Sequence, residues 1–79
     1  DAKSAIQKSR SKQRKEFEEL ERHIEEVEEL LTELEAKFTT IDPSDFVRLQ
    51  EMKDEYDAMK KDLEAMYADW ERLAEEMAQ

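Results

Sequence analysis

The residues of this chain best suited to binding chemistry are cations near its N-terminus. They are Lys8, Arg10, Lys12, Arg14 and Lys15. Residues 1–15 hold six basic side chains against one acidic side chain, which gives this segment a net charge of +5. Lysine and arginine attract phosphate oxygens, and clustered cations are the electrostatic signature of nucleic-acid binding. These five residues are therefore a candidate nucleic-acid-binding site, with a solvated linker as the plain alternative.

Helical spacing divides the five cations into two sets with different expected roles. At about 100° per residue, Lys8, Lys12 and Lys15 share one stripe of a helix, opposite its apolar line. Arg10 falls on that apolar line, and Arg14 lies beside it. We expect the lysines to contact phosphate, and the arginines to be shared between phosphate and the protein's own core.

The rest of the chain is strongly acidic. Residues 16–79 hold seven basic and 22 acidic side chains, a net charge of −15 within a total of −10 for the 79 residues. This body should repel phosphates along most of its length. Contact with DNA or ribosomal RNA is therefore expected only at the basic segment.

No residue pattern predicts a catalytic site, a cofactor site or a metal site. His23 is the only histidine and the chain has no cysteine, so a metal ion would have only carboxylates as further ligands. The glutamates of residues 25–29 read as a solvated helix face, which lacks the burial that acid–base catalysis needs. There is also no apolar run long enough to span a membrane. We expect a non-enzymatic piece of a larger cytoplasmic protein, without membrane contact.

Two apolar seams predict the elements that position the cations. The first consists of Phe17, Leu20, Ile24, Val27, Leu31, Leu34 and Phe38, and the second of Leu49, Met52, Tyr56, Met59, Leu63, Met66, Trp70, Leu73 and Met77. Steps of three and four mark heptad repeats, in which a helix buries one narrow stripe against another helix. The chain has no glycine, which disfavours the tight turns of sheets. The predicted fold class is all-α.

The break between the seams predicts a two-helix antiparallel coiled-coil hairpin. We expect the turn at about residues 39–44, where Asp42 would cap a second helix that begins at Pro43. A connection this short folds the second helix back along the first. The chain then divides into a basic segment at 1–15, partly helical or frayed, and the hairpin at 16–79. A monomer or a weak dimer is expected.

The seams also predict a register between the helices. Pairing Leu34 with Leu49 and Phe17 with Met66 joins an a position to a d position in every layer. On one flank this register brings three glutamates towards two lysines, which are Glu21, Glu28 and Glu35 with Lys53 and Lys60.

The same register makes predictions for both ends of the hairpin. At the open end Trp70 lies opposite Gln13, under the aliphatic stems of Arg10 and Arg14. At the turn, Phe46 and Val47 either close the core or form a small apolar knob for a partner.

The end of the second seam resembles a known family. Tyr67, Trp70, Glu71 and Leu73 follow a pattern of Tyr or Phe, two residues, Trp-Glu, one residue and Leu. This looks like the end of the C-terminal hairpin of ABC-F proteins, which are soluble ATPases with duplicated ATP-binding cassettes. Residues 11–20 and 45–50 are similar to the starts of that hairpin and of its second helix. The resemblance covers about residues 9 to 77.

The resemblance implies an accessory module attached behind two ATPase domains. Members of that family are cytoplasmic and act on ribosomes or their assembly, hence on translation, and in some the hairpin binds DNA. The Walker A motif of such ATPases is absent here, so this chain should neither bind nor hydrolyse ATP; the resemblance implies ATP as the cofactor of the parent protein. The expected function is a non-catalytic accessory domain that contacts DNA or ribosomal RNA through the basic segment. The alternative is a structural or protein-docking coiled-coil spacer that binds no nucleic acid.

Overall fold

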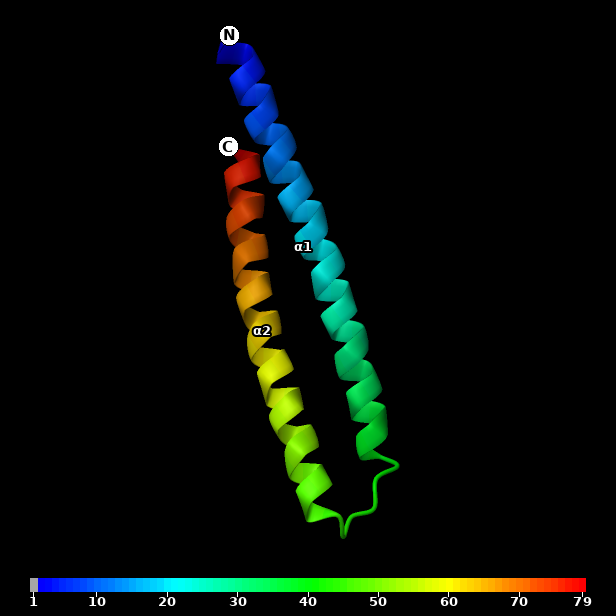
Figure 1. Cartoon of the computed structure of the whole chain (residues 1–79). Helices are drawn as coiled ribbons and strands as arrows, with labels where there is room; N and C mark the ends of the chain where they lie inside the picture. Colours follow the sequence, from blue (N-terminus) through cyan, green and yellow to red (C-terminus); the bar gives the residue numbers. More distant parts are fainter. Residues whose placement is uncertain (1) are drawn as a thin grey trace.

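The protein is an antiparallel hairpin of two long helices. The computed structural model describes the backbone of residues 2–79 and the side chains of residues 9–79. Helix α1 (Ala2–Phe38) and helix α2 (Phe46–Ala78) lie side by side and are joined by residues 39–45 (Figure 1). The Cα atoms of the chain span 66 × 16 × 15 Å. The all-α hairpin predicted from the seams is confirmed.

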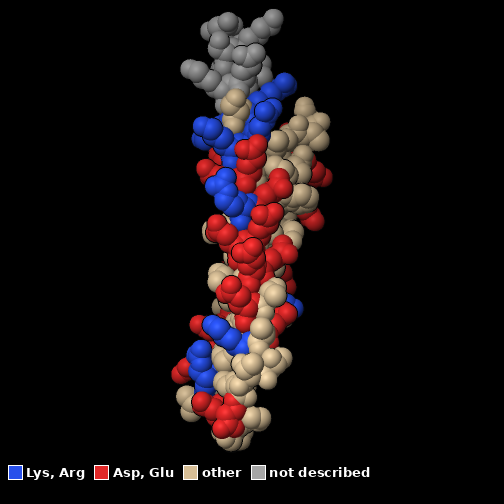
Figure 2. Space-filling view, turned by 90° about the vertical axis from the view of Figure 1, so that its right-hand side faces the viewer, with Lys and Arg blue, Asp and Glu red and all other residues tan. Residues whose placement is uncertain are grey.

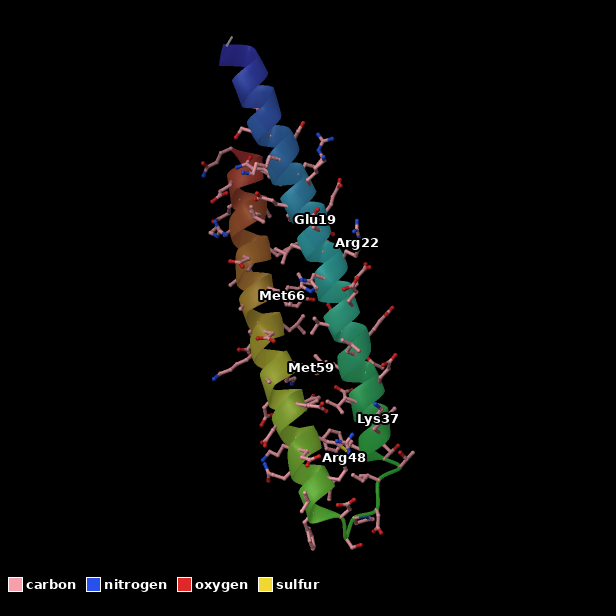
Figure 3. All side chains as sticks on the ribbon, viewed as in Figure 1. Glu19, Arg22, Lys37, Arg48, Met59 and Met66 are labelled. Carbon is pink, nitrogen blue, oxygen red and sulfur yellow. The ribbon has the colours of Figure 1, made fainter. Side chains whose placement is uncertain are left out.

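The two seams form the core. Five side chains are fully buried, which are Ile24, Leu31 and Leu34 from α1 and Met52 and Leu73 from α2. The other seam residues are half-buried except Met77, which is 39% exposed. Figure 3 shows Met59 and Met66 extending from α2 towards α1, as the heptad pattern requires. Helices of this length owe most of their stability in water to such packing.

Helix α1 ends without a glycine. The hydroxyl of Thr39 donates a hydrogen bond to the carbonyl of Ala36 (2.7 Å), and the hydroxyl of Thr40 donates one to the carbonyl of Lys37 (3.1 Å). The amide of Ile41 also donates to the Lys37 carbonyl. These bonds satisfy carbonyls that have no partner inside the helix. No described residue therefore needs a positive φ.

The predicted cap of α2 is wrong by three residues. Asp42 does not cap a helix; its carboxylate accepts hydrogen bonds from the amide (2.9 Å) and the hydroxyl (2.8 Å) of Ser44. The Asp45 amide donates to the Asp42 carbonyl, so Pro43 occupies the second position of a turn, where its fixed φ is favourable. The N-cap is Asp45, whose carboxylate accepts from the Arg48 amide at 3.1 Å.

This longer connection shifts the register by about one heptad from the predicted one. Phe17 stacks on Trp70, with 5.5 Å between ring centroids, whereas the prediction placed Phe17 on Met66. Phe38 packs edge-on against Tyr56 at 6.2 Å. The connection runs past the end of α1 before α2 begins (Figure 1), so α2 lies further towards the connection than predicted.

One flank of the hairpin is closed by tyrosines, and we call it the tyrosine flank. The hydroxyl of Tyr67 donates a hydrogen bond to Glu28 (2.6 Å), and that of Tyr56 donates one to Glu35 (3.2 Å). The amine of Lys60 lies 5.3 Å from the centre of the Tyr56 ring. The predicted glutamate–lysine pairs on this flank are not formed. Within residues 9–79, every ion pair joins two residues of α2.

The observed register can be tested by crosslinking. A variant with Glu28→Cys and Tyr67→Cys should crosslink within one chain when treated with a short bismaleimide, because these residues are in contact. The control is Glu16→Cys with Tyr67→Cys, a pair that the seam-based register places opposite one another. Residue 16 lies about 18 Å from residue 28 along α1. More efficient crosslinking of the control would contradict the register, and the natural chain has no cysteine to interfere.

The hydrogen bond from Tyr67 to Glu28 should make the stability of the hairpin depend on pH in alkaline solution. The bond to Glu28 raises the pKa of Tyr67 above its ordinary value of 10.0, with smaller contributions from desolvation and the Glu28 charge. The stabilisation is therefore present below pH 10.0 and is lost as the pH rises through the raised pKa. A Tyr56→Phe variant leaves Tyr67 as the only tyrosine, so its tyrosinate absorbance reports this pKa. Adding Glu28→Gln should lower that pKa; an unchanged titration would show that Glu28 is not the cause.

Candidate nucleic-acid interface

The predicted basic site lies at the open end of the hairpin, on α1. Arg10, Lys12, Arg14 and Lys15 are all exposed, and the side chain of Lys8 lies outside the described residues. Figure 2 shows basic side chains gathered towards this end, acidic ones along the middle of the face, and a smaller basic group near the connection. The structure therefore brings four of the five predicted cations together on one solvent-exposed helix segment.

The two arginines face the end of α2. Arg10 and Arg14, with Gln13, line a hollow of about 340 Å³ against residues 76–79. Glu76 and the last carbonyls of α2 make this end electronegative, because a helix carries partial negative charge at its C-terminus. The arginines are thus placed where their charge stabilises α2.

Lys12 and Lys15 do not line that hollow. Their helical spacing places them on another side of α1, as the division into two sets predicted. Both side chains are exposed. The lysines and the arginines therefore have different surroundings, and the lysines face solvent.

The predicted contact between the arginines and Trp70 is wrong. Trp70 is half-buried against Phe17, and its exposed side borders an open hollow lined by α2 residues alone, without Arg10 or Arg14. The cause is again the register, since its shift places the arginines beside residues 76–79. Trp70 is a seam residue, as expected, but its partner is an aromatic ring and not a cation.

The end of the hairpin at the connection carries an exposed apolar pair. Phe46 is 76% exposed and Val47 is 72% exposed, in the first turn of α2. The expectation that they close the core at the turn is wrong, because α2 begins beyond the end of α1. Ile41 in the connection is half-buried instead. We call Phe46 and Val47 the apolar tip.

The described residues hold few other groups able to do chemistry. No three His, Asp, Glu or Cys side chains among them are placed to hold one metal ion. His23 and the neighbouring glutamates are exposed. Among the same residues, neither helix is long and apolar enough to cross a membrane.

Sequence reasoning missed two features of this surface. The tyrosine–glutamate hydrogen bonds depend on the register between the helices, so no local sequence pattern predicts them. Leu30 is 51% exposed beside the buried Leu31. The sequence could have predicted the exposure of Leu30, because this apolar residue lies one position off the strict seam.

Comparison with known proteins gives one match. The model of a family described as "ABC transporter C-terminal domain" matches residues 8–75, which is most of the chain. No curated protein and no solved structure matches.

The two sets of cations should differ in their effect on stability. Changing Arg10 and Arg14 together to Glu places negative charge beside the C-terminal end of α2, and should lower the free energy of unfolding by about 1 kcal/mol. The matched control changes Lys12 and Lys15 to Glu. It makes the same change in net charge away from that end, and should change stability by less than about 0.5 kcal/mol. Urea unfolding followed by circular dichroism measures both, and equal losses would contradict the different placement of the two sets.

Proposed function

This chain belongs to the ABC transporter C-terminal domain family, and we propose that it contacts DNA or ribosomal RNA through the cations of α1. It is an accessory domain of an ABC protein, a helical hairpin and not a catalytic ATPase domain. The observation that carries the proposal is the group of exposed cations on α1, of which Lys12 and Lys15 lie outside the hollow that holds the arginines. Such cations are available to phosphate oxygens.

The proposed binding mode follows from the charge distribution. Lys12 and Lys15, with Lys8 on the same helical stripe, contact the nucleic-acid backbone. Arg10 and Arg14 divide their charge between phosphate and the end of α2. The nucleic-acid phosphates repel the acidic residues of the rest of the hairpin, so this part points away from the nucleic acid. Contacts of this kind carry no base specificity of their own.

We further propose that the parent protein is an ABC-F type ATPase. The stretches that resemble that group include residues 11–20 and the Trp-Glu-x-Leu ending. These stretches pack against each other through the stack of Phe17 on Trp70, so the resembling residues form one structural unit. In this proposal the parent is cytoplasmic, binds ATP in its own cassette domains, and acts on ribosomes.

The apolar tip favours a second candidate function, a protein-docking spacer. Phe46 and Val47 are more exposed than the other large apolar side chains among the described residues. An exposed aromatic residue beside a β-branched one suits a small pocket on another protein. In this version the hairpin holds the tip at a distance, and the cations of α1 play no part in binding.

Salt-dependent binding tests the proposal. The chain is titrated against labelled duplex DNA and against a structured ribosomal RNA, at low and at physiological salt. If four cations engage duplex DNA, the logarithm of affinity should fall against the logarithm of salt concentration with a slope of about −3.6. Changing Lys8, Lys12 and Lys15 to Glu should abolish binding.

The matched control changes Lys37, Lys53 and Lys61 to Glu. It alters net charge by the same amount but leaves the basic segment intact. Retained binding in this control would assign the effect to the basic segment. Equal losses in both variants would point to net charge alone, and no binding at low salt would favour the protein-docking spacer.

A further inference from the structure

The flank opposite the tyrosine flank is open and contains an apolar groove. Leu30 projects into solvent there, 51% exposed. The groove has a volume of about 410 Å³. Its lining residues come from both helices and are Leu30, Glu33, Leu34 and Lys37 from α1, and Glu55, Ala58, Met59 and Asp62 from α2. We call this surface the leucine groove.

The two flanks of the hairpin differ in how their seam is covered. On the tyrosine flank, hydrogen bonds from Tyr56 and Tyr67 to glutamates join the helices over the core. At the leucine groove, half-buried Met59 is flanked by Leu30 and by exposed Ala58. A methyl side chain such as that of Ala58 lets another backbone come close. Ala65 lies two helical turns further along the same face of α2 and extends this shallow surface.

The shape of the groove suits a third helix. In helical bundles a helix packs its ridge of side chains into the groove between two neighbours. Leu30, Leu34 and Met59 would then form one core layer with an apolar residue of the added helix. Burying Leu30 would remove from water an apolar side chain that the hairpin alone leaves half-covered.

The charge around the groove selects the partner. Its rim carries Glu33, Glu55 and Asp62 against the single cation Lys37. Around it, residues 26–38 of α1 hold five glutamates and one lysine, and residues 51–66 of α2 hold six acidic and three basic side chains. This field repels nucleic acid and acidic proteins, and it attracts lysine and arginine side chains.

We propose that the leucine groove docks a basic amphipathic helix of a partner protein. An apolar residue of that helix packs on Leu30 and Met59, and its lysines or arginines pair with Glu33, Glu55 and Asp62. This docking does not rest on nucleic-acid binding by the basic segment, which lies towards the other end of α1. The small apolar area makes the contact weak and transient unless other contacts support it.

The test uses a labelled helical peptide of leucines and lysines with its leucines on one face, followed by fluorescence anisotropy against the whole chain. Leu30→Gln should weaken its binding by about tenfold, since it removes the apolar anchor. Ala58→Gln should weaken it as well by filling the floor of the groove. Both positions are exposed, so circular dichroism melts should show folded hairpins. Unchanged affinity in both variants would overturn the proposal.

Two paired variants separate the groove from general attraction between opposite charges. Glu33→Gln with Asp62→Gln alters the rim, and Glu18→Gln with Glu64→Gln makes the same change in net charge on exposed residues outside the groove. The first pair should lower affinity several-fold more than the second. Equal losses would overturn the proposal. So would self-association of the chain that Leu30→Gln abolishes while the peptide fails to bind, because a second copy would then occupy the groove.

Discussion

The stagger between the two helices is the constraint on which the other contacts depend. A heptad seam repeats every seven residues, so two such helices can pack almost equally well in registers one heptad apart. The connection removes this ambiguity. Its turn at Pro43 and its cap at Asp45 start α2 beyond the end of α1. From this offset follow the stack of Phe17 on Trp70, the tyrosine–glutamate bonds and the exposure of the apolar tip.

The parts of the fold that depend on periodicity were predictable, and those that depend on the register were not. Helical phase alone assigns the seam residues to the core and separates Lys12 and Lys15 from Arg10 and Arg14. The N-cap was predicted at Asp42 because Pro43 follows it, but the Asp42 carboxylate is taken up by Ser44 and the cap is Asp45. The seams alone also left the register one heptad away from the observed one, so the predicted partner of Trp70 and the predicted glutamate–lysine pairs were wrong.

The surface divides by charge along the length of the hairpin (Figure 2). Cations gather at the open end, acidic residues dominate the middle, and a smaller basic group lies near the connection, where the apolar tip also is. Arg10 and Arg14 line a hollow together with the end of α2, whereas Lys12 and Lys15 do not. The acidic middle of the hairpin repels phosphate, which favours phosphate contact at the open end only. It attracts basic partners to the leucine groove. In the two proposals, the partners therefore differ in chemistry and use different residues of one narrow domain.

The length of the hairpin has a mechanical consequence. The molecule is 66 Å long but only 16 and 15 Å across, and its tip lies at the far end from Arg10 and Arg14. When a body of this shape turns about one end, its other end moves the furthest. The tip lies about one length of α2, roughly 50 Å, from the open end, so it sweeps roughly 9 Å if that end is held and turns by about 10°. Small rotations at the held end would thus become large displacements of Phe46 and Val47.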